Sequence, residues 1–261
     1  MNSLLKTSFG LVAKEYQKYR RSYDARLFRL LFSLFGAAKT DKTYSILDIG
    51  CGTGKSTEPI FVARGKRKIS VVGVDPDKAM LHEARLSAHK KKLPITYISG
   101  SAEKLPFPDD TFDAAIAGAA FHWFANKRAF RSIKKVLKKD GLFFVFWVQY
   151  VKTNKPAIGN SVYDKFNFKG IPKNLRSQAS VGKILRGAGF KKVQTVVVPF
   201  TEKRTIVQTI GLWKTNSSYT LLSKKDRKNF VKEMTVAYQA ALGKKKFDVN
   251  KMELRVCYGF K

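Results

Sequence analysis

Three glycines alternate with other residues in the segment Gly50-Cys51-Gly52-Thr53-Gly54, directly after an apolar run. Glycine has no Cβ, so it adopts left-handed backbone and lets a ligand approach the main chain closely. The spacing differs from the G-x-G-x-x-G of dinucleotide sites, and no G-x-x-x-x-G-K-[ST] phosphate loop is present. The segment therefore predicts a ligand-binding turn, with a tight turn of purely structural function as the alternative.

Asp75 ends the next apolar run of the chain. An acidic side chain at that point can accept hydrogen bonds from both hydroxyls of a ribose. Together with the glycine turn, it predicts a site for an adenosine-bearing ligand that has no pyrophosphate to be bound.

Apolar runs and amphipathic stretches alternate along the first 150 residues. This alternation predicts a doubly wound α/β sheet, because each buried strand is followed by a helix that can cover it. Asp77 is positioned to cap the helix that follows Asp75. The expected strands are residues 45–50, 69–74, 95–98, 112–117 and 142–148, and helices are expected at 55–63, after Asp77, and at 128–138.

The pattern changes after residue 150. We expect an irregular connection over 152–174, a helix at 181–188, a strand at 192–198, a helical stretch over 202–242 and a last strand at 253–258. The chain is then a single domain of residues 1–261. Its parts are an N-terminal helical cap (1–40), a cofactor-binding core (41–150) and the second half of the sheet (151–261) with a helical lid at about 200–245.

Several motifs in order resemble the class I S-adenosylmethionine-dependent methyltransferases. They are residues 48–54 with the glycine turn, 73–76 (Gly-Val-Asp-Pro) and 100–107 (Gly-Ser-Ala-Glu-Lys-Leu-Pro-Phe), extended by residues 109–113 and 136–141. The resemblance implies an enzyme that uses S-adenosyl-L-methionine and releases S-adenosyl-L-homocysteine. It also implies a Rossmann-like, mostly parallel sheet of seven strands whose last strand is antiparallel.

The resemblance also implies which residues contact the cofactor. Gly50, Gly52 and Gly54 would border its methionine part and ribose, and Asp75 would hold the ribose hydroxyls. Pro76 and Met80 would lie beside the adenine, with Ser101 and Ala102 at its edge; many relatives have an acidic residue at the position of Ser101. The remaining positions implied in the cofactor site are Tyr19, Arg20, Asp48, Cys51, Glu103, Ala117 and Gly118.

A second group of motifs narrows the resemblance to the trans-aconitate-methyltransferase-like, type 11 small-molecule enzymes. Residues 120–124 (Ala-Phe-His-Trp-Phe) resemble the His-Trp-Phe segment of these relatives, which implies that His122 and Trp123 lie on the acceptor side. Residues 16–23 resemble an N-terminal segment that folds over the cofactor, with Arg21 where proline is usual. Residues 215–219 resemble the lid over the acceptor.

Methyl transfer from a sulfonium is an in-line displacement, so aligning the acceptor supplies much of the rate. A carboxylate acceptor needs no base, whereas a hydroxyl would use His122 as a general base. Trp123 could donate its indole N–H to an acceptor oxygen. The alternative for His122 is a histidine packed in a loop, and the alternative for Trp123 is a simple aromatic wall of the pocket.

The net charge of the chain is compatible with other classes of methyl acceptor. Lysine and arginine number 51 against 19 aspartates and glutamates, a formal net charge of +32, and residues 131–261 alone carry +22. Such an excess favours contact with polyanions. The leading hypothesis is a small-molecule acceptor with a carboxylate or hydroxyl group. RNA, or a lipid or quinone on an anionic membrane, is the alternative, and a cofactor-binding module without turnover is a third.

The remaining composition indicates a cytoplasmic globular protein. Apolar residues make up 44% of the chain, and its two cysteines, Cys51 and Cys257, are far apart. No signal peptide is visible, and the longest apolar run, residues 142–148, is far shorter than the ~20 residues of a membrane span. The histidines and cysteines show no ligand spacing, so we expect no metal site. Monomer and homodimer both stay open.

Overall fold

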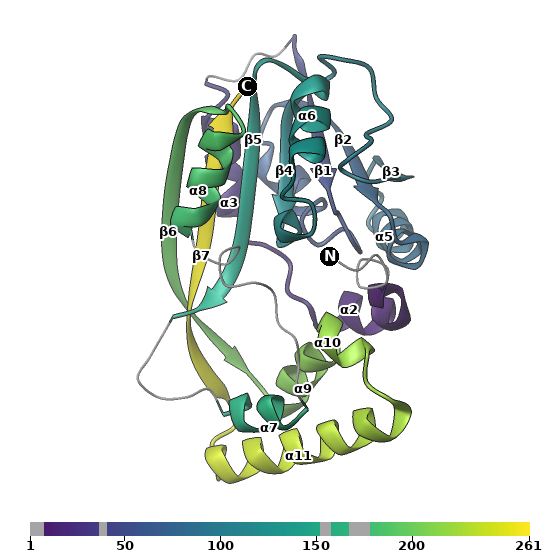
Figure 1. Cartoon of the computed structure of the whole chain (residues 1–261), viewed down its shortest axis with the longest axis vertical. Coiled ribbons are helices and arrows are strands. Elements are labelled where there is room, and N and C mark those ends of the chain that lie inside the picture. Colours follow the sequence, from purple (N-terminus) through teal and green to yellow (C-terminus); the bar gives the residue numbers. More distant parts are fainter. Residues whose placement is uncertain (1–7, 37–40, 152–157, 167–177) are drawn as a thin grey trace.

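A seven-stranded sheet forms the centre of the computed structural model, which describes residues 8–36, 41–151, 158–166 and 178–261 (Figure 1). Its strand order is β3-β2-β1-β4-β5-β7-β6. β7 runs antiparallel to both of its neighbours, and the other pairs are parallel. This confirms the predicted fold class. The strands are β1 (Thr43–Ile49), β2 (Lys68–Asp75), β3 (Ile95–Ser99), β4 (Phe112–Gly118), β5 (Leu137–Tyr150), β6 (Lys191–Arg204) and β7 (Asp248–Phe260).

Helices cover both faces of the sheet. Successive side chains of a strand point to opposite faces, so Phe143 of β5 packs in one apolar core and Phe144 in the other. This two-sided burial explains why residues 142–148 are continuously apolar. The first core is covered by α6 (Lys127–Val136) and α8 (Gln178–Gly187), the second by α3 (Ala25–Ser33) and α4 (Pro59–Ala63), and α5 (Lys78–Lys90) packs beside β3.

The helix expected at 55–63 begins later than predicted. Residues 52–58 form consecutive turns, and α4 has its first residue at Pro59. The hydroxyls of Ser56 and Thr57 donate to the Asp48 carboxylate instead of facing solvent. Such side-chain bonds compete with regular helix, which accounts for the late start. The cap of α5 is as predicted, because the Asp77 carboxylate accepts from the backbone N–H of Ala79 and Met80.

β5, β6 and β7 extend beyond the rest of the sheet and reach a separate layer of helices (Figure 1). That layer has its own apolar core, which includes Phe230 and Met234. β6 runs to Arg204, and a capping box at Thr205 begins the first helix, so the helical stretch starts after residue 202. The helices are α7 (Asn160–Lys165), α9 (Ile206–Lys214), α10 (Ser217–Thr220) and α11 (Lys224–Leu242).

Two other expectations are corrected here. The connection over 152–174, predicted as irregular, contains α7, whose Val162 packs into the core of the helical layer; residues 152–157 and 167–174 lie outside the described part. The last strand is longer than the predicted 253–258, because β7 pairs with β6 down to Asp248. Residues before the sheet form a 3₁₀ turn, η1 (Ser8–Val12), then α2 (Ala13–Tyr19), and they lie against α9 and α10.

Candidate cofactor and acceptor site

The three glycines of the turn all have left-handed backbone, with φ of +71° at Gly50, +54° at Gly52 and +84° at Gly54. A Cβ on Gly50 would stand 2.5 Å from the Ala120 side chain, and one on Gly54 would stand 2.5 Å from the Tyr97 hydroxyl. At Gly52 the only neighbour among the described residues within 4 Å is the flexible end of Met80, at 3.2 Å. Gly50 and Gly54 are therefore needed by the protein's own packing. Gly52 leaves room beside the main chain, as a ligand cradle requires.

Asp75 is connected to this turn directly. Its Oδ2 accepts the Gly52 N–H at 2.9 Å, and its Oδ1 accepts the Asp77 N–H at 2.9 Å. Burial raises the pKa of Asp75 to about 6, although the two backbone hydrogen bonds partly oppose the rise. A carboxylate has about four acceptor positions, so two remain for ribose hydroxyls.

Asp48 lies beneath the turn and is fully buried. Its Oδ2 accepts from the hydroxyls of Ser56 and Thr57, both at 2.7 Å, while Oδ1 has no hydrogen-bond partner among the described residues. Burial raises the pKa of Asp48 to about 6. A buried carboxylate oxygen without a partner costs free energy unless a donor reaches it. Asp75 and Asp48, together with the glycine turn, thus fit a ligand that offers two hydroxyl groups and a cationic group.

The positions implied beside the adenine surround Asp75. Met80 is buried and Pro76 is exposed. The backbone N–H of Gly100 donates to the Asp75 carbonyl at 3.2 Å, which holds Ser101 and buried Ala102 next to the end of β2. Three other positions serve the protein's own packing or hydrogen bonding: Glu103 accepts from Asn126, Ala117 is fully buried in a core, and Gly118 packs against Phe146 and Ser56.

Cys51 is buried, and its thiol is not paired in a disulfide. A Cβ on Gly73 would stand 2.9 Å from its sulfur, so the side chain points back into the sheet. Burial raises the pKa of the Cys51 thiol well above its ordinary value. It is therefore a packed thiol of low reactivity rather than a nucleophile.

His122 and Trp123 form a short 3₁₀ turn, η2 (Phe121–Trp123), just beyond β4. Their ring centroids are 4.9 Å apart, and both side chains are half-buried. Phe9 packs edge-on against Trp123, with centroids 5.7 Å apart. The neighbouring Gly10 donates its N–H to the Asp77 carboxylate at 2.7 Å. Residues 9–10 thereby connect η2 to the cap of α5, a contact that the sequence pattern did not indicate.

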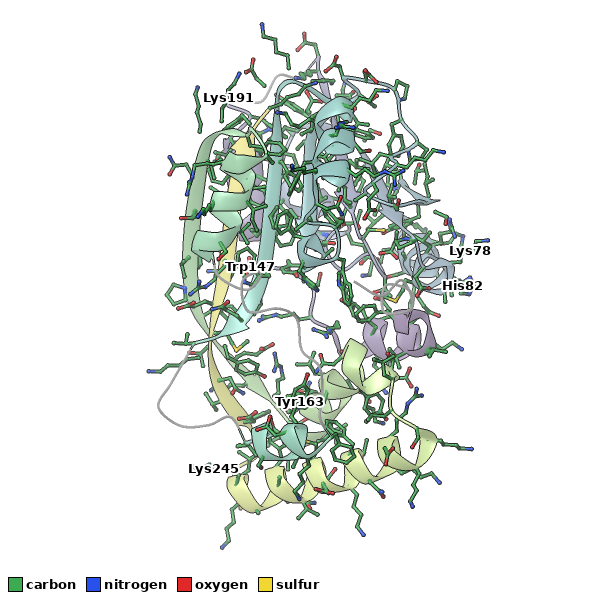
Figure 2. All side chains as sticks on the ribbon, in the orientation of Figure 1. Lys78, His82, Trp147, Tyr163, Lys191 and Lys245 are labelled. Atoms are coloured by element: carbon green, nitrogen blue, oxygen red, sulfur yellow. The ribbon has the colours of Figure 1, made fainter. Side chains whose placement is uncertain are left out.

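Trp147 is a second tryptophan at the same edge, one residue beyond the point where β5 pairs with the last residue of β4. It packs against the same core as Trp123 and donates its indole N–H to Gln149 at 3.3 Å. In Figure 2 it lies at the end of the sheet that faces the helical layer. Sequence analysis missed Trp147 because it continues an apolar run and carries no motif of its own.

Arg20 and Tyr19 are engaged by the helical layer. Arg20 donates to Thr215 Oγ1 at 2.7 Å, to the Thr215 carbonyl at 3.3 Å and to Asn216 Oδ1 at 2.9 Å. The Tyr19 ring occupies the space where Gly211 lacks a side chain, since a Cβ there would stand 2.3 Å from it. Both residues attach the N-terminal segment to the helical layer, and their contact with a cofactor stays a prediction.

We expect Arg20→Leu to loosen this attachment, because it removes three hydrogen bonds and the charge that makes them strong. Amide exchange in residues 206–220 should become faster, while donor affinity should change by less than about 0.5 kcal/mol if Arg20 serves only the lid. Hydrogen exchange and calorimetric titration measure the two effects. A large loss of donor affinity with unchanged exchange would instead place Arg20 at the cofactor.

Comparison with known proteins identifies the class of enzyme. Residues 47–145 match the family described as a methyltransferase domain, a range that includes the glycine turn, Asp75, His122 and Trp123. The chain is an S-adenosylmethionine-dependent methyltransferase with the class I fold. Its methyl donor is S-adenosylmethionine, which the hydroxyl and cation acceptors at Asp75 and Asp48 fit. Within the described residues, no helix is long and apolar enough to span a membrane.

Relatives of this methyltransferase occur in yeasts and bacteria. It is 27% identical over 222 residues to the uncharacterized methyltransferase C25B8.09 of Schizosaccharomyces pombe, covering 84% of this chain and 82% of the relative. It is 31% identical over 173 residues to the probable S-adenosylmethionine-dependent methyltransferase CRG1 of Saccharomyces cerevisiae, covering 62% of this chain and 55% of the relative.

Solved structures show the same fold. A chain from Anaeromyxobacter dehalogenans, proposed to be a type II methyltransferase, matches with a TM-score of 0.64 at 21% identity over 93% of this chain and 98% of that one. Phosphoethanolamine N-methyltransferase 2 of Haemonchus contortus, in complex with S-adenosyl-L-methionine, matches with a TM-score of 0.55 at 18% identity over 98% of this chain and 57% of that one.

Proposed function

We propose that this methyltransferase transfers the methyl group to a carboxylate or hydroxyl of a small-molecule acceptor that binds beside His122 and Trp123. One observation carries the proposal: this half-buried pair follows β4 at the sheet edge that holds the glycine turn and Asp75. In open α/β sheets, ligands bind outside the carboxyl ends of the strands. The Haemonchus neighbour acts on phosphoethanolamine, which supports a small acceptor without defining its reacting group.

The protein's contribution is binding, orientation and, for one acceptor class, proton removal. S-adenosylmethionine supplies an activated methyl group on a sulfonium. Asp75 and the Gly52 main chain would hold the ribose, and Asp48 would accept from the ammonium group. The Trp123 N–H would orient an acceptor oxygen, and His122 would take the proton of a hydroxyl acceptor, whereas a carboxylate needs no base. Phe9 would exclude water from the acceptor side.

Calorimetric titration with S-adenosylmethionine, followed by methyl-transfer assays on carboxylic acids, phenols, aliphatic alcohols and RNA, tests this proposal. We expect donor binding and transfer to at least one small acid or hydroxyl compound. Transfer to RNA alone, or to amines alone, would contradict the proposal for the acceptor and leave the cofactor assignment intact.

Asp75→Asn should weaken donor binding and reduce its pH dependence. Loss of the charged acceptor costs about 1–3 kcal/mol at pH 7.5. In the wild type, protonation of Asp75 and Asp48 near pH 6 removes acceptor oxygens, so affinity should fall as the pH drops through 6. The variant retains only the Asp48 contribution, and its pH profile should be flatter. Titrations from pH 5 to 8 measure this; parallel profiles for both proteins would contradict the role given to Asp75.

A further inference from the structure

A cavity of about 550 Å³ opens at the sheet edge opposite the glycine turn. It lies where β1, β4 and β5 begin and β7 ends, and its apolar wall includes Phe35, Tyr44 and Phe260. Tyr44 and Gly50 are six residues apart along β1, so at about 3.3 Å per residue the cavity lies about 20 Å from the cofactor turn. Cavities of about 300–1,000 Å³ are typical of ligand sites.

The lining of this cavity is strongly basic. Four separate segments contribute lysines, against two aspartates in the same lining. The six lysines are Lys42, Lys138, Lys139, Lys191, Lys192 and Lys261, and the aspartates are Asp113 and Asp140. Ammonium groups brought together in this way repel one another, so the arrangement is unfavourable until an anion joins them.

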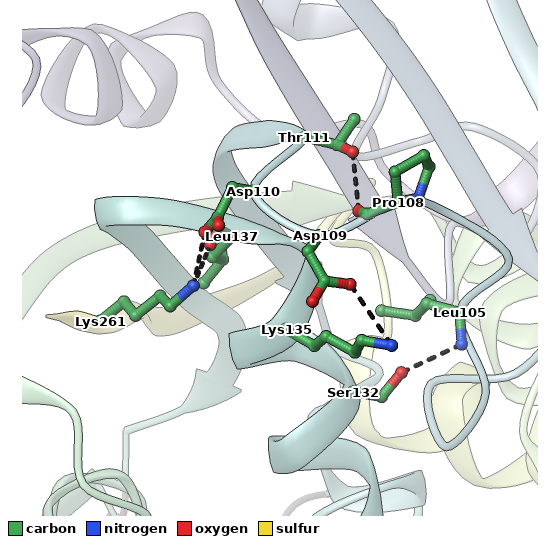
Figure 3. A network of polar contacts seen from close by, with 9 residues as sticks. All are labelled: Leu105, Pro108, Asp109, Asp110, Thr111, Ser132, Lys135, Leu137 and Lys261. Carbon is green, nitrogen blue, oxygen red and sulfur yellow. Dashed lines mark hydrogen bonds and ion pairs between the residues drawn. The ribbon is translucent and has the colours of Figure 1, made fainter.

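Three of the lysines already have a carboxylate partner, two of them the same one. Asp113, whose side chain is 8% exposed, accepts from Lys42 and Lys138, each at 2.8 Å. Although burial alone raises the pKa of Asp113, these lysines and the Ser45 N–H bring it below its ordinary value, so the carboxylate stays charged. Lys261 turns to Asp110 and the Leu137 carbonyl, at 2.7 and 2.6 Å (Figure 3).

Lys139, Lys191 and Lys192 keep their charge available. All three are exposed, and none has an ion pair with the part of the chain that the structure describes. Lysine binds phosphate as a point charge, whereas planar recognition of bases or carboxylates favours arginine, which this cavity lacks. Three exposed ammonium groups around a concave wall fit several phosphates in a row.

We propose that this cavity binds a chain of phosphate groups, supplied by a nucleoside triphosphate or by an RNA strand, at a site separate from the site of methyl transfer. Because the contacts are to phosphates, they carry no base sequence. RNA held there is docked about 20 Å from the cofactor turn and is not thereby presented as the methyl acceptor. The charge of +32 adds long-range attraction for such ligands.

The test compares two triple variants of equal charge. Lys139→Gln/Lys191→Gln/Lys192→Gln removes the free ammonium groups of the cavity. Lys228→Gln/Lys244→Gln/Lys245→Gln removes three exposed lysines of the helical layer; Figure 2 places Lys191 and Lys245 at opposite ends of the molecule. Fluorescence anisotropy with a labelled single-stranded oligoribonucleotide is measured over a salt series, with competition by ATP and by inorganic tripolyphosphate.

At about 0.7 released counterions per single-strand contact, three lysines contribute about 2 to the slope of log affinity against log salt. We expect the cavity variant to lose that slope, and roughly 100-fold in affinity at about 0.1 M salt, while the control variant keeps the wild-type slope. Displacement of RNA by ATP and by tripolyphosphate would show that all three ligands bind at one shared site. Binding of the two small ligands without RNA binding identifies a nucleotide as the source and also supports the proposal.

Equal losses in both triple variants would overturn the proposal, since the effect would then come from overall charge. Binding only to vesicles that contain phosphatidylserine would overturn it too, as would no binding of RNA or the small phosphates by the wild type. Titration of both variants with S-adenosylmethionine checks that they are folded and that the cavity is separate from the cofactor site. A loss of donor affinity confined to the cavity variant would contradict a separate site. None of these outcomes depends on which acceptor is methylated.

Discussion

Gly52→Val should lower the affinity for S-adenosylmethionine by roughly 100-fold or more, about 2.7 kcal/mol, and should abolish turnover at ordinary donor concentrations. The side chain would enter the space that Gly52 leaves open beside the main chain, where only the end of Met80 is near. It would also strain the left-handed backbone, whose φ is +54°. Calorimetric titration measures the loss of binding.

Gly65→Ala and Gly52→Ala separate the two causes of this loss. Gly65 has a similar φ of +61°, and no atom of the described part of the chain lies within 4 Å of the position that a Cβ would take there, so its substitution introduces backbone strain alone. Both alanine variants should lose about 1–2 kcal/mol of stability, as measured by denaturant unfolding. Only Gly52→Ala should also lose donor affinity. Equal donor affinity in the two variants would show that the turn does not form the cradle.

His122→Asn should distinguish between the two acceptor classes of the proposed function. If the acceptor is a hydroxyl, loss of the base lowers kcat by roughly 10²–10⁴-fold. If it is a carboxylate, which is already nucleophilic, the variant should retain most of its kcat. Steady-state kinetics with the acceptor identified in the screen provide the measurement.

Trp123→Phe is the companion variant, since it keeps the aromatic wall and the contact with Phe9 but removes the indole N–H. We expect reduced turnover with donor affinity within about 0.5 kcal/mol of the wild type. If both variants transferred methyl groups normally and bound the donor poorly, the assignment of His122 and Trp123 to the acceptor side would be wrong.

Local sequence was sufficient to predict the elements that are determined by one strong pattern of neighbouring residues. Residues 142–148 are apolar without interruption because β5 is buried on both faces, so a strand there could be predicted without knowledge of its partners. Asp77 could be identified as a cap because its bonds reach only two and three residues along the chain. The glycine turn, too, depends on short-range conformational preferences.

Contacts between distant parts of the chain could not be predicted in this way. Arg20 meets Thr215 across 195 residues, and neither residue's type indicates the other as its partner. The late start of α4 depends on Asp48, which accepts from two hydroxyls that would otherwise favour solvent. The lysines of the basic cavity come from four segments that are dispersed through the sequence, so the charge count revealed the excess of lysine but not where it gathers.

The helical layer is carried by β5, β6 and β7, which continue from the sheet as paired strands. β7 pairs with β6 without a break from Gln194–Tyr258 to Arg204–Asp248, and with β5 as far as Tyr150. A support of this kind resists bending, because tilting it would stretch a ladder of backbone hydrogen bonds. The distance between the helical layer and the sheet edge is therefore set by strand length, whereas the N-terminal segment is attached by a few side chains at Phe9, Tyr19 and Arg20.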